Sequence, residues 1–235
     1  MSRANLKKTI VIVIVIFILI IISGKFIKEV SVDSPIYDYT IVIDAGHGAR
    51  DGGCVGVSGS IEKDLNLEYA LTLKSLLETK NIKVIMTRTN DDELYDDNAI
   101  NKKLSEMKAR ATLIKNTAPD LVVSIHMNSF PLKSVNGAKA FYRADSEKSK
   151  IVADNIQKSM HYYCNIKSKT SASGDYYILN CTDYTSVLVE CGYLSNIEEE
   201  QKLIKTEYRE KLMHSVYVGI LLSFGLNRYW FSFCR

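Results

Sequence analysis

The chain has 235 residues, of which 46% are hydrophobic and 24% are charged. This composition is typical of a globular protein and not of a disordered one, and the length suits one domain with an appendage. The formal net charge is +3 at pH 7, and no long run of lysine and arginine occurs, so nucleic-acid binding has no support.

The N-terminus predicts a segment that directs export. Three basic residues lie among the first eight, and an uninterrupted apolar run follows from Ile10 to Ile22. Basic residues ahead of an apolar segment predict that the N-terminus stays inside while the rest of the chain is exported. We interpret residues 1–24 as an uncleaved signal anchor or a cleaved signal peptide. The lack of an Ala-x-Ala-like cleavage site favours the anchor.

The rest of the chain divides into three parts. Residues 25–38 are interpreted as a linker and residues 39–227 as the folded domain. Residues 228–235 form an aromatic tail, which we expect to pack on the core, with a position at a membrane surface as the alternative.

Strands alternate with helices along the folded domain. This alternation predicts an α/β sheet that is at least partly parallel. Apolar residues at helical spacing predict a second helix whose buried stripe begins at Ile100 and ends at Ile114. Strands are expected at residues 40–43, 82–87, 121–125, 138–142, 176–179 and 186–189, and helices at 61–80, 100–114, 146–163 and, in one or two pieces, 196–225.

Three predicted strands end at residues suited to metal chemistry. The first runs through Asp44 to His47, the third ends at His126, and the last ends at Glu190. Ligands bind outside the carboxyl ends of parallel strands, so these side chains are expected at one edge of the sheet. Glu62 is expected near the same edge, because its helix begins close to where the first strand ended.

Two histidines and a glutamate, with an open fourth position, form a known catalytic zinc set. A second glutamate would then act as the general base. The spacing alone does not decide whether Glu62 or Glu190 is the ligand. Glu62 alone could also be the acidic first turn of a helix.

Other charged side chains are expected to be structural. His161 and His214 lie within predicted helices. Arg88 and Arg110 are expected in ion pairs or at the edge of a site and not as catalytic groups.

The five cysteines have no C-x-x-C spacing, which predicts neither a disulfide framework nor a structural zinc site. An exported protein could form a bridge between Cys181 and Cys191. A cysteine hydrolase that uses Cys54 or Cys191 with a histidine is an alternative function. Glu190 beside Cys191 disfavours a thiolate there.

Four segments of the sequence resemble those of a known family, the zinc-dependent N-acetylmuramoyl-L-alanine amidases. The order and spacing of four segments agree, and the resemblance extends over about residues 39–226. Within the family the chain looks most similar to the germination-specific, spore-cortex amidases. The matching segments are Ile43–Gly48, Glu62–Asn66, Ser124–Asn128 and Val189–Asn196.

The resemblance implies a single catalytic domain behind an N-terminal hydrophobic helix, with a central, mostly parallel, mixed sheet flanked by helices on both faces. It implies that His47, Glu62 and His126 hold a zinc ion and that Glu190 is the catalytic base. Asp44 would orient one of the ligands. Ala49 departs from the family's usual second glycine after Gly-His-Gly, which affects the shape of the loop and not the ligands.

The implied reaction is hydrolysis of the amide between the lactyl group of N-acetylmuramic acid and L-alanine of the stem peptide, in spore-cortex modification or germination. The expected partners are peptidoglycan and, through the N-terminal segment, a membrane, with the enzyme facing the cell wall. An activating protein or a second copy of the chain cannot be read from the sequence. The alternatives are a zinc peptidase of the stem peptide and a non-catalytic protein that binds the wall.

Overall fold

The structure is a computed structural model that describes residues 39–91, 94 and 98–226. The predicted anchor, linker and aromatic tail lie outside the described residues. Within the described part of the chain, no helix is both long and apolar enough to cross a membrane.

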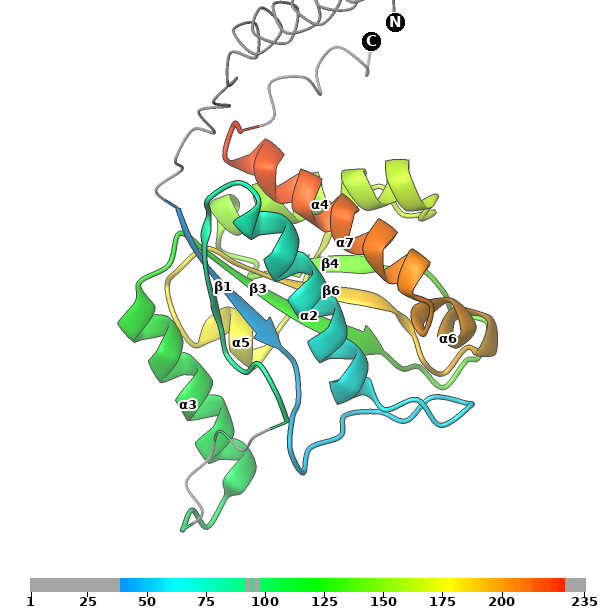
Figure 1. The fold of residues 1–235 in the computed structure, drawn as a ribbon, viewed down its shortest axis with the longest axis horizontal. Coiled ribbons are helices and arrows are strands. Elements are labelled where there is room, and N and C mark those ends of the chain that lie inside the picture. The colour runs from blue at the N-terminus through cyan, green and yellow to red at the C-terminus, as the bar shows by residue number, and fades with distance from the viewer. Residues whose placement is uncertain (1–38, 92–93, 95–97, 227–235) are drawn as a thin grey trace, which may run out of the picture. The chain divides into compact units, whose positions relative to one another are not determined.

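A six-stranded sheet forms the centre of the domain, with the strand order β2-β1-β3-β6-β4-β5 (Figure 1). The first four strands in that order run parallel, and β4 pairs with β6 in the antiparallel direction. The carboxyl ends of β1, β3 and β6 therefore meet at one edge. The strands are β1 (Thr40–Ala45), β2 (Lys83–Met86), β3 (Leu121–Asn128), β4 (Lys139–Tyr142), β5 (Ala172–Ser173) and β6 (Ser186–Tyr193).

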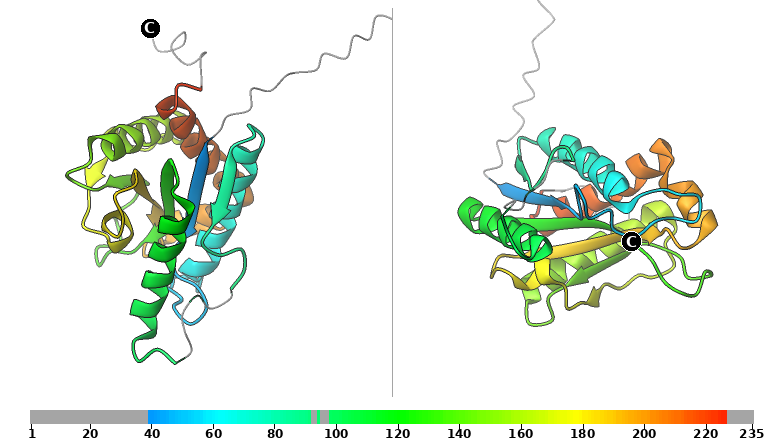
Figure 2. Two further views of the ribbon diagram at one scale, coloured as in Figure 1. Left: turned by 90° about the vertical axis from the view of Figure 1, so that its left-hand side faces the viewer. Right: turned by 90° about the horizontal axis from the view of Figure 1, so that it is seen from below.

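Helices cover both faces of the sheet (Figures 1 and 2). Three long helices, α2, α4 and α7, pack on one face, while α3 and the short α5 pack on the other. The prediction of a mixed α/β sheet flanked by helices on both faces is confirmed. The helices are α2 (Glu62–Glu78), α3 (Lys102–Thr117), α4 (Glu147–Cys164), α5 (Tyr177–Asn180), α6 (Ile197–Leu203) and α7 (Thr206–Ser223).

Both faces of the central strands are buried, because successive strand residues point to opposite sides of a sheet. In β1, Ile41 and Ile43 pack into the larger core beneath α2, α4 and α7. Val42, between them, packs into the smaller core on the side of α3 and α5. This two-sided burial explains why the strands read as continuous apolar runs.

The strand predicted at residues 176–179 is wrong, because the chain forms the short helix α5 there. In a strand, Ile178 and Leu179 would point to opposite faces. One helical turn lets both side chains pack into the smaller core. The preceding segment, where no strand was predicted, contains the short edge strand β5.

The buried stripe predicted for the second helix is only partly correct. Ala111 and Ile114 of α3 are buried, whereas Ile100, before the helix, and Leu104, in its first turn, are exposed. The first turns of α3 extend past the end of the sheet in Figure 1, so they have no sheet surface to cover.

Candidate metal centre and active site

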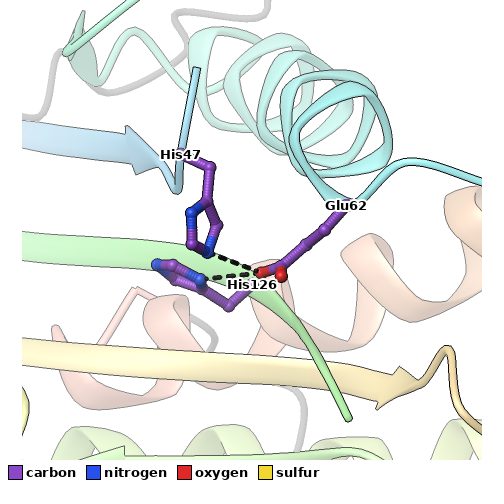
Figure 3. A group of neighbouring side chains, drawn as sticks. All are labelled: His47, Glu62 and His126. Carbon is purple, nitrogen blue, oxygen red and sulfur yellow. Dashed lines mark hydrogen bonds and ion pairs between the residues drawn. The ribbon is translucent and has the colours of Figure 1, made fainter. Parts of the chain in front are cut away.

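Glu62 lies at the centre of the candidate site (Figure 3). Its Oε1 atom lies 3.2 Å from Nε2 of His47 and 3.0 Å from Nδ1 of His126. Burial alone would raise the pKa of Glu62, but hydrogen bonds with His126 and His47 outweigh burial and hold that pKa well below its usual range. Glu62 is therefore a carboxylate anion between two imidazoles at neutral pH.

Three further groups fix the Glu62 side chain, one of which is the main-chain N–H of Met127, which donates to Oε1 at 3.3 Å. The main-chain N–H of Cys54 donates to Oε2 at 2.9 Å, and Nδ2 of Asn66 donates to Oε1 at 3.2 Å. Asn66 also donates to the main-chain oxygen of Gly46 at 3.0 Å. The first turns of α2 are thereby tied to the turn that carries His47.

His47 lies on a turn directly after β1, with a left-handed backbone φ of 60°. Ala49 also adopts a positive φ, 47°, at the position where the family usually has glycine. A side chain other than glycine is uncommon in this region and needs support from its surroundings. One support is Arg110, whose Nη2 donates to the main-chain oxygen of His47 at 2.6 Å.

His126 lies inside β3 and is held mainly by the sheet. Its ring packs directly over Gly46, where an added Cβ atom would lie 2.2 Å from ring atoms Cε1 and Nε2. The main-chain N–H of Gly46 also donates to the oxygen of Ile125 at 3.0 Å. Glycine is therefore required at position 46 for the imidazole to reach Glu62.

The residues present fit a zinc ion. His47, Glu62 and His126 each offer one ligand atom, and these atoms all lie within 4.8 Å of one another. Tetrahedral zinc with bonds of about 2.0–2.2 Å keeps its ligand atoms roughly 3.3–3.6 Å apart. The separations of 3.0 and 3.2 Å require only a small outward shift to match this geometry.

Glu190 lies in β6, in register with His126 on the neighbouring strand β3. Its side chain is only 7% exposed, and its Oε2 atom has no hydrogen-bond partner among the residues that the structure describes. Burial raises the pKa of Glu190 to about 7, although the nearby His126 opposes this shift. A carboxyl group with this pKa can both accept and release a proton near neutral pH.

These side chains line one cavity of about 340 Å³. His47, Glu62 and His126 line it together with Glu190 and Tyr176. All four residues predicted for the site are thus brought together at the carboxyl edge of the sheet.

Asp44 reaches His47 through Arg110. Its carboxylate accepts hydrogen bonds from Arg110, from Thr87 at 2.9 Å and from Ser124 at 2.6 Å. Burial would raise the pKa of Asp44, but the charge of Arg110 and the hydrogen bond from Ser124 lower it. The role predicted for Asp44 as an orienting residue stays a prediction, with Arg110 as the intermediate group.

Arg88 and Arg110 both donate hydrogen bonds to main-chain oxygens at the end of β1 and in the turn that follows it. Arg110 forms the predicted ion pairs, with Asp44 and Glu106. Arg88 instead donates to main-chain oxygens, including those of Ala45 at 3.0 Å and Gly46 at 3.1 Å.

The remaining histidines are structural, as predicted. His161 lies with Nδ1 2.6 Å from the main-chain oxygen of Ile166. His214 packs against the rings of Tyr163 and Tyr217.

Two loops that border the cavity are attached to α6. Glu200 accepts hydrogen bonds from two main-chain N–H groups of the glycine loop, residues 49–60, at 2.7 and 3.2 Å. The adjacent Glu199 accepts one from Gly137, in the loop of residues 129–138, at 2.7 Å. One turn of a short helix therefore holds both loops.

The structure contradicts the cysteine-based alternatives. Burial and the charge of Glu62 raise the pKa of Cys54 to about 12, and burial raises the pKa of Cys191 well above its usual value. A cysteine nucleophile must be a thiolate, so neither residue suits that role. Cys181 and Cys191 are free thiols, so the bridge considered between them is not formed.

Two residues at the site were missed by the sequence analysis, Asp51 and Asn66. Asn66 lies four residues after Glu62 on α2, and this spacing places both side chains on one face of a helix. Asp51 lies four residues after His47 in an irregular turn, where sequence spacing carries no comparable signal.

Comparisons with known proteins agree with this site. Residues 41–221 match the model of a family described as N-acetylmuramoyl-L-alanine amidase. The germination-specific N-acetylmuramoyl-L-alanine amidase of Bacillus subtilis (strain 168) is 32% identical over 197 residues, which cover 81% of each chain.

Solved structures give the same result. The CwlD amidase from Clostridioides difficile, in complex with the GerS lipoprotein, is 33% identical with a TM-score of 0.77, covering 81% of this chain and 100% of that one. An N-acetylmuramoyl-L-alanine amidase from Clostridium difficile 630 is 31% identical with a TM-score of 0.71, covering 80% and 97%. The family match spans most of the described domain, and the chain therefore belongs to the N-acetylmuramoyl-L-alanine amidase family of peptidoglycan hydrolases.

Proposed function

We propose that this protein is a zinc-dependent enzyme that hydrolyses the amide bond between the lactyl group of N-acetylmuramic acid and L-alanine of the stem peptide. The observation that carries the proposal is the convergence of His47, Glu62 and His126 beside the buried Glu190. The donor set is that of a catalytic zinc site, and the family membership supplies the substrate class.

His47, Glu62 and His126 would hold the metal, with the negative charge of Glu62 offsetting part of its positive charge. When bound, zinc would polarise the scissile carbonyl and acidify the attacking water. Glu190 would accept a proton from that water and donate it to the departing alanine nitrogen. Its pKa of about 7 suits both transfers.

We further propose that the enzyme acts on the spore wall, as the similarity to the germination-specific Bacillus subtilis enzyme supports. The complex of the similar Clostridioides difficile amidase with a lipoprotein supports a protein partner for this chain as well. Export and anchoring through residues 1–24 belong to the same proposal and rest on the sequence alone.

The test is mass spectrometry of purified peptidoglycan after incubation with the protein. We expect stem peptides with a free N-terminal alanine, no such products in the presence of a chelator, and recovery when zinc is restored. His126→Ala is expected to lose both zinc and cleavage. His214→Ala, a histidine outside the site, is the matched control and should retain both.

Other products would identify other functions. Shortened peptides that remain attached to muramic acid would indicate a peptidase. Zinc binding without any cleavage would indicate a wall-binding protein, and cleavage that survives both the chelator and His126→Ala would contradict the assignment of the site.

A further inference from the structure

We propose that Asp51 is a positioning residue for the metal site: in the zinc-loaded protein its carboxylate accepts a hydrogen bond from the Nδ1–H group of His47 and thereby presents Nε2 to the metal. The inference rests on the proposed zinc-dependent function, and it concerns a residue that is neither a metal ligand nor the base.

The first support is the placement of the His47 ring between two carboxylates. Nδ1 lies 3.0 Å from Oδ2 of Asp51, an ion-pair distance at which the N–H group is not aligned for a hydrogen bond, and Nε2 lies 3.2 Å from Oε1 of Glu62. A neutral imidazole has one nitrogen that donates and one that accepts. An acceptor at Nδ1 selects the form in which Nε2 has a free electron pair for a metal.

The second support is that Asp51 is itself fixed in place. Its main-chain N–H and C=O groups exchange hydrogen bonds with those of Gly48, at 2.9 and 3.0 Å. Its Oδ1 atom accepts a hydrogen bond from the N–H of Gly53 at 3.1 Å. The two carboxylate oxygens thus have different partners, since Oδ1 holds the loop and Oδ2 faces the imidazole.

The third support is that the His47 ring lies on a turn and has no strand to orient it. Arg110 holds the main chain of His47 and makes no contact that chooses between the two ring nitrogens, while the ring packs edge-on against His126. Lys103 approaches Asp51 to 3.6 Å from the solvent side, with a side chain that is 74% exposed. Asp51 is therefore the group that controls which nitrogen faces the metal.

The test measures zinc affinity of the metal-stripped, full-length protein by competition with a chromophoric chelator. Loss of a partner that holds a ligating histidine typically weakens metal binding about 10–100-fold, and this is the effect expected for Asp51→Ala. Asp51→Asn keeps an acceptor oxygen and should lose less. Asp91→Ala is the matched control, because Asp91 accepts a hydrogen bond at 2.8 Å from Ala49 in the same turn without being placed at the ring.

A spectroscopic signature separates positioning from a general loosening of the loop. In the zinc-loaded protein, the Nδ1 proton of His47 should give a downfield NMR resonance that exchanges slowly with water. It should exchange rapidly in Asp51→Ala, shift upfield in Asp51→Asn and stay unchanged in Asp91→Ala.

Equal zinc affinities of Asp51→Ala and Asp91→Ala, or a protected Nδ1 proton in Asp51→Ala, would overturn the inference while the proposed function stands. Failure of the unsubstituted protein to bind zinc would overturn the proposed function and this inference with it. If Asp51→Ala does not fold, the zinc affinities and Nδ1 proton exchange of Asp51→Asn and Asp91→Ala are compared instead, and equal values in the two variants would overturn the inference.

Discussion

The candidate site has two halves that are built differently. His126 and Glu190 lie on adjacent parallel strands and are paired in register. His47 lies on a turn with a left-handed backbone, and Glu62 opens a helix that follows the glycine loop. The first half is positioned by the hydrogen bonds of the sheet, and the second by side chains such as Asn66 and Arg110.

The difference separates a rigid half, which holds the base and one metal ligand, from an adjustable half, which holds the other two ligands. Proton transfer needs a base at a fixed distance from the reacting atoms, and a central strand provides that rigidity. Metal binding also needs ligands that can move a few tenths of an ångström when the ion enters, and the supported turn and the helix start allow this for His47 and Glu62. Changes in the two halves should therefore differ in what they disturb.

The largest expected effect comes from the sheet half. Glu190→Ala should lower the rate of cleavage about 10²–10⁴-fold, because the reaction loses its general base. Zinc affinity should change little, since Glu190 is not one of the three grouped ligand atoms. The measurement pairs peptidoglycan cleavage with zinc titration, and loss of zinc together with activity would contradict the assignment of Glu190 as a base that is not a metal ligand.

The next effect is on stability, in the metal-free protein. The pKa of Glu190 is about 7 in the folded chain against 4.5 for an unperturbed glutamate. Between these values the unfolded chain ionises while the folded chain keeps its proton, so the free energy of unfolding falls as pH rises. The fall is at most about 3 kcal/mol over this window.

Glu190→Gln cannot ionise and should lack this part of the pH dependence. Denaturant unfolding of both proteins at pH 4.5, 6 and 8 measures the difference between them. A constant difference across that range would show that Glu190 is not held protonated by burial.

The smallest of the three effects belongs to the loop half. Gly53 has a left-handed φ of 69°, and an added Cβ atom would lie 2.5 Å from Oε2 of Glu62 and 2.8 Å from Cδ2 of His47. Gly53→Ala should weaken zinc binding about tenfold, because two ligands must shift. Gly59→Ala is the control, since it is also left-handed but open space surrounds its Cβ position. Equal zinc affinities of the two variants would indicate backbone strain alone.

Much of the fold and the four proposed site residues could be predicted from the sequence. Buried parallel strands appear as continuous apolar runs, so the residues that end them could be placed at one edge of the sheet. Spacing alone left open whether Glu62 or Glu190 is the ligand, and the family resemblance implied Glu62. Glu62 contacts both histidines through one oxygen atom, whereas Glu190 lies across the strand pair.

The features that were not predicted depend on contacts between residues whose spacing in the sequence follows neither a helical nor a strand period. Asp51 reaches His47 through an irregular turn. Residues 176–179 have the composition of a strand but form a helical turn, because the smaller core accepts Ile178 and Leu179 together. In both cases, distant parts of the chain decide the local conformation.

The glycine loop and the loop of residues 129–138 are both attached to α6, so we expect them to detach from it together. A partly open state that releases Glu200 from the glycine loop also moves Glu199, so the hold on Gly137 is lost in the same event. Amide protons of the two loops should then exchange with deuterium at one shared free energy of opening, although the loops are far apart in sequence. The two loops should therefore respond together to local unfolding of the seven residues of α6.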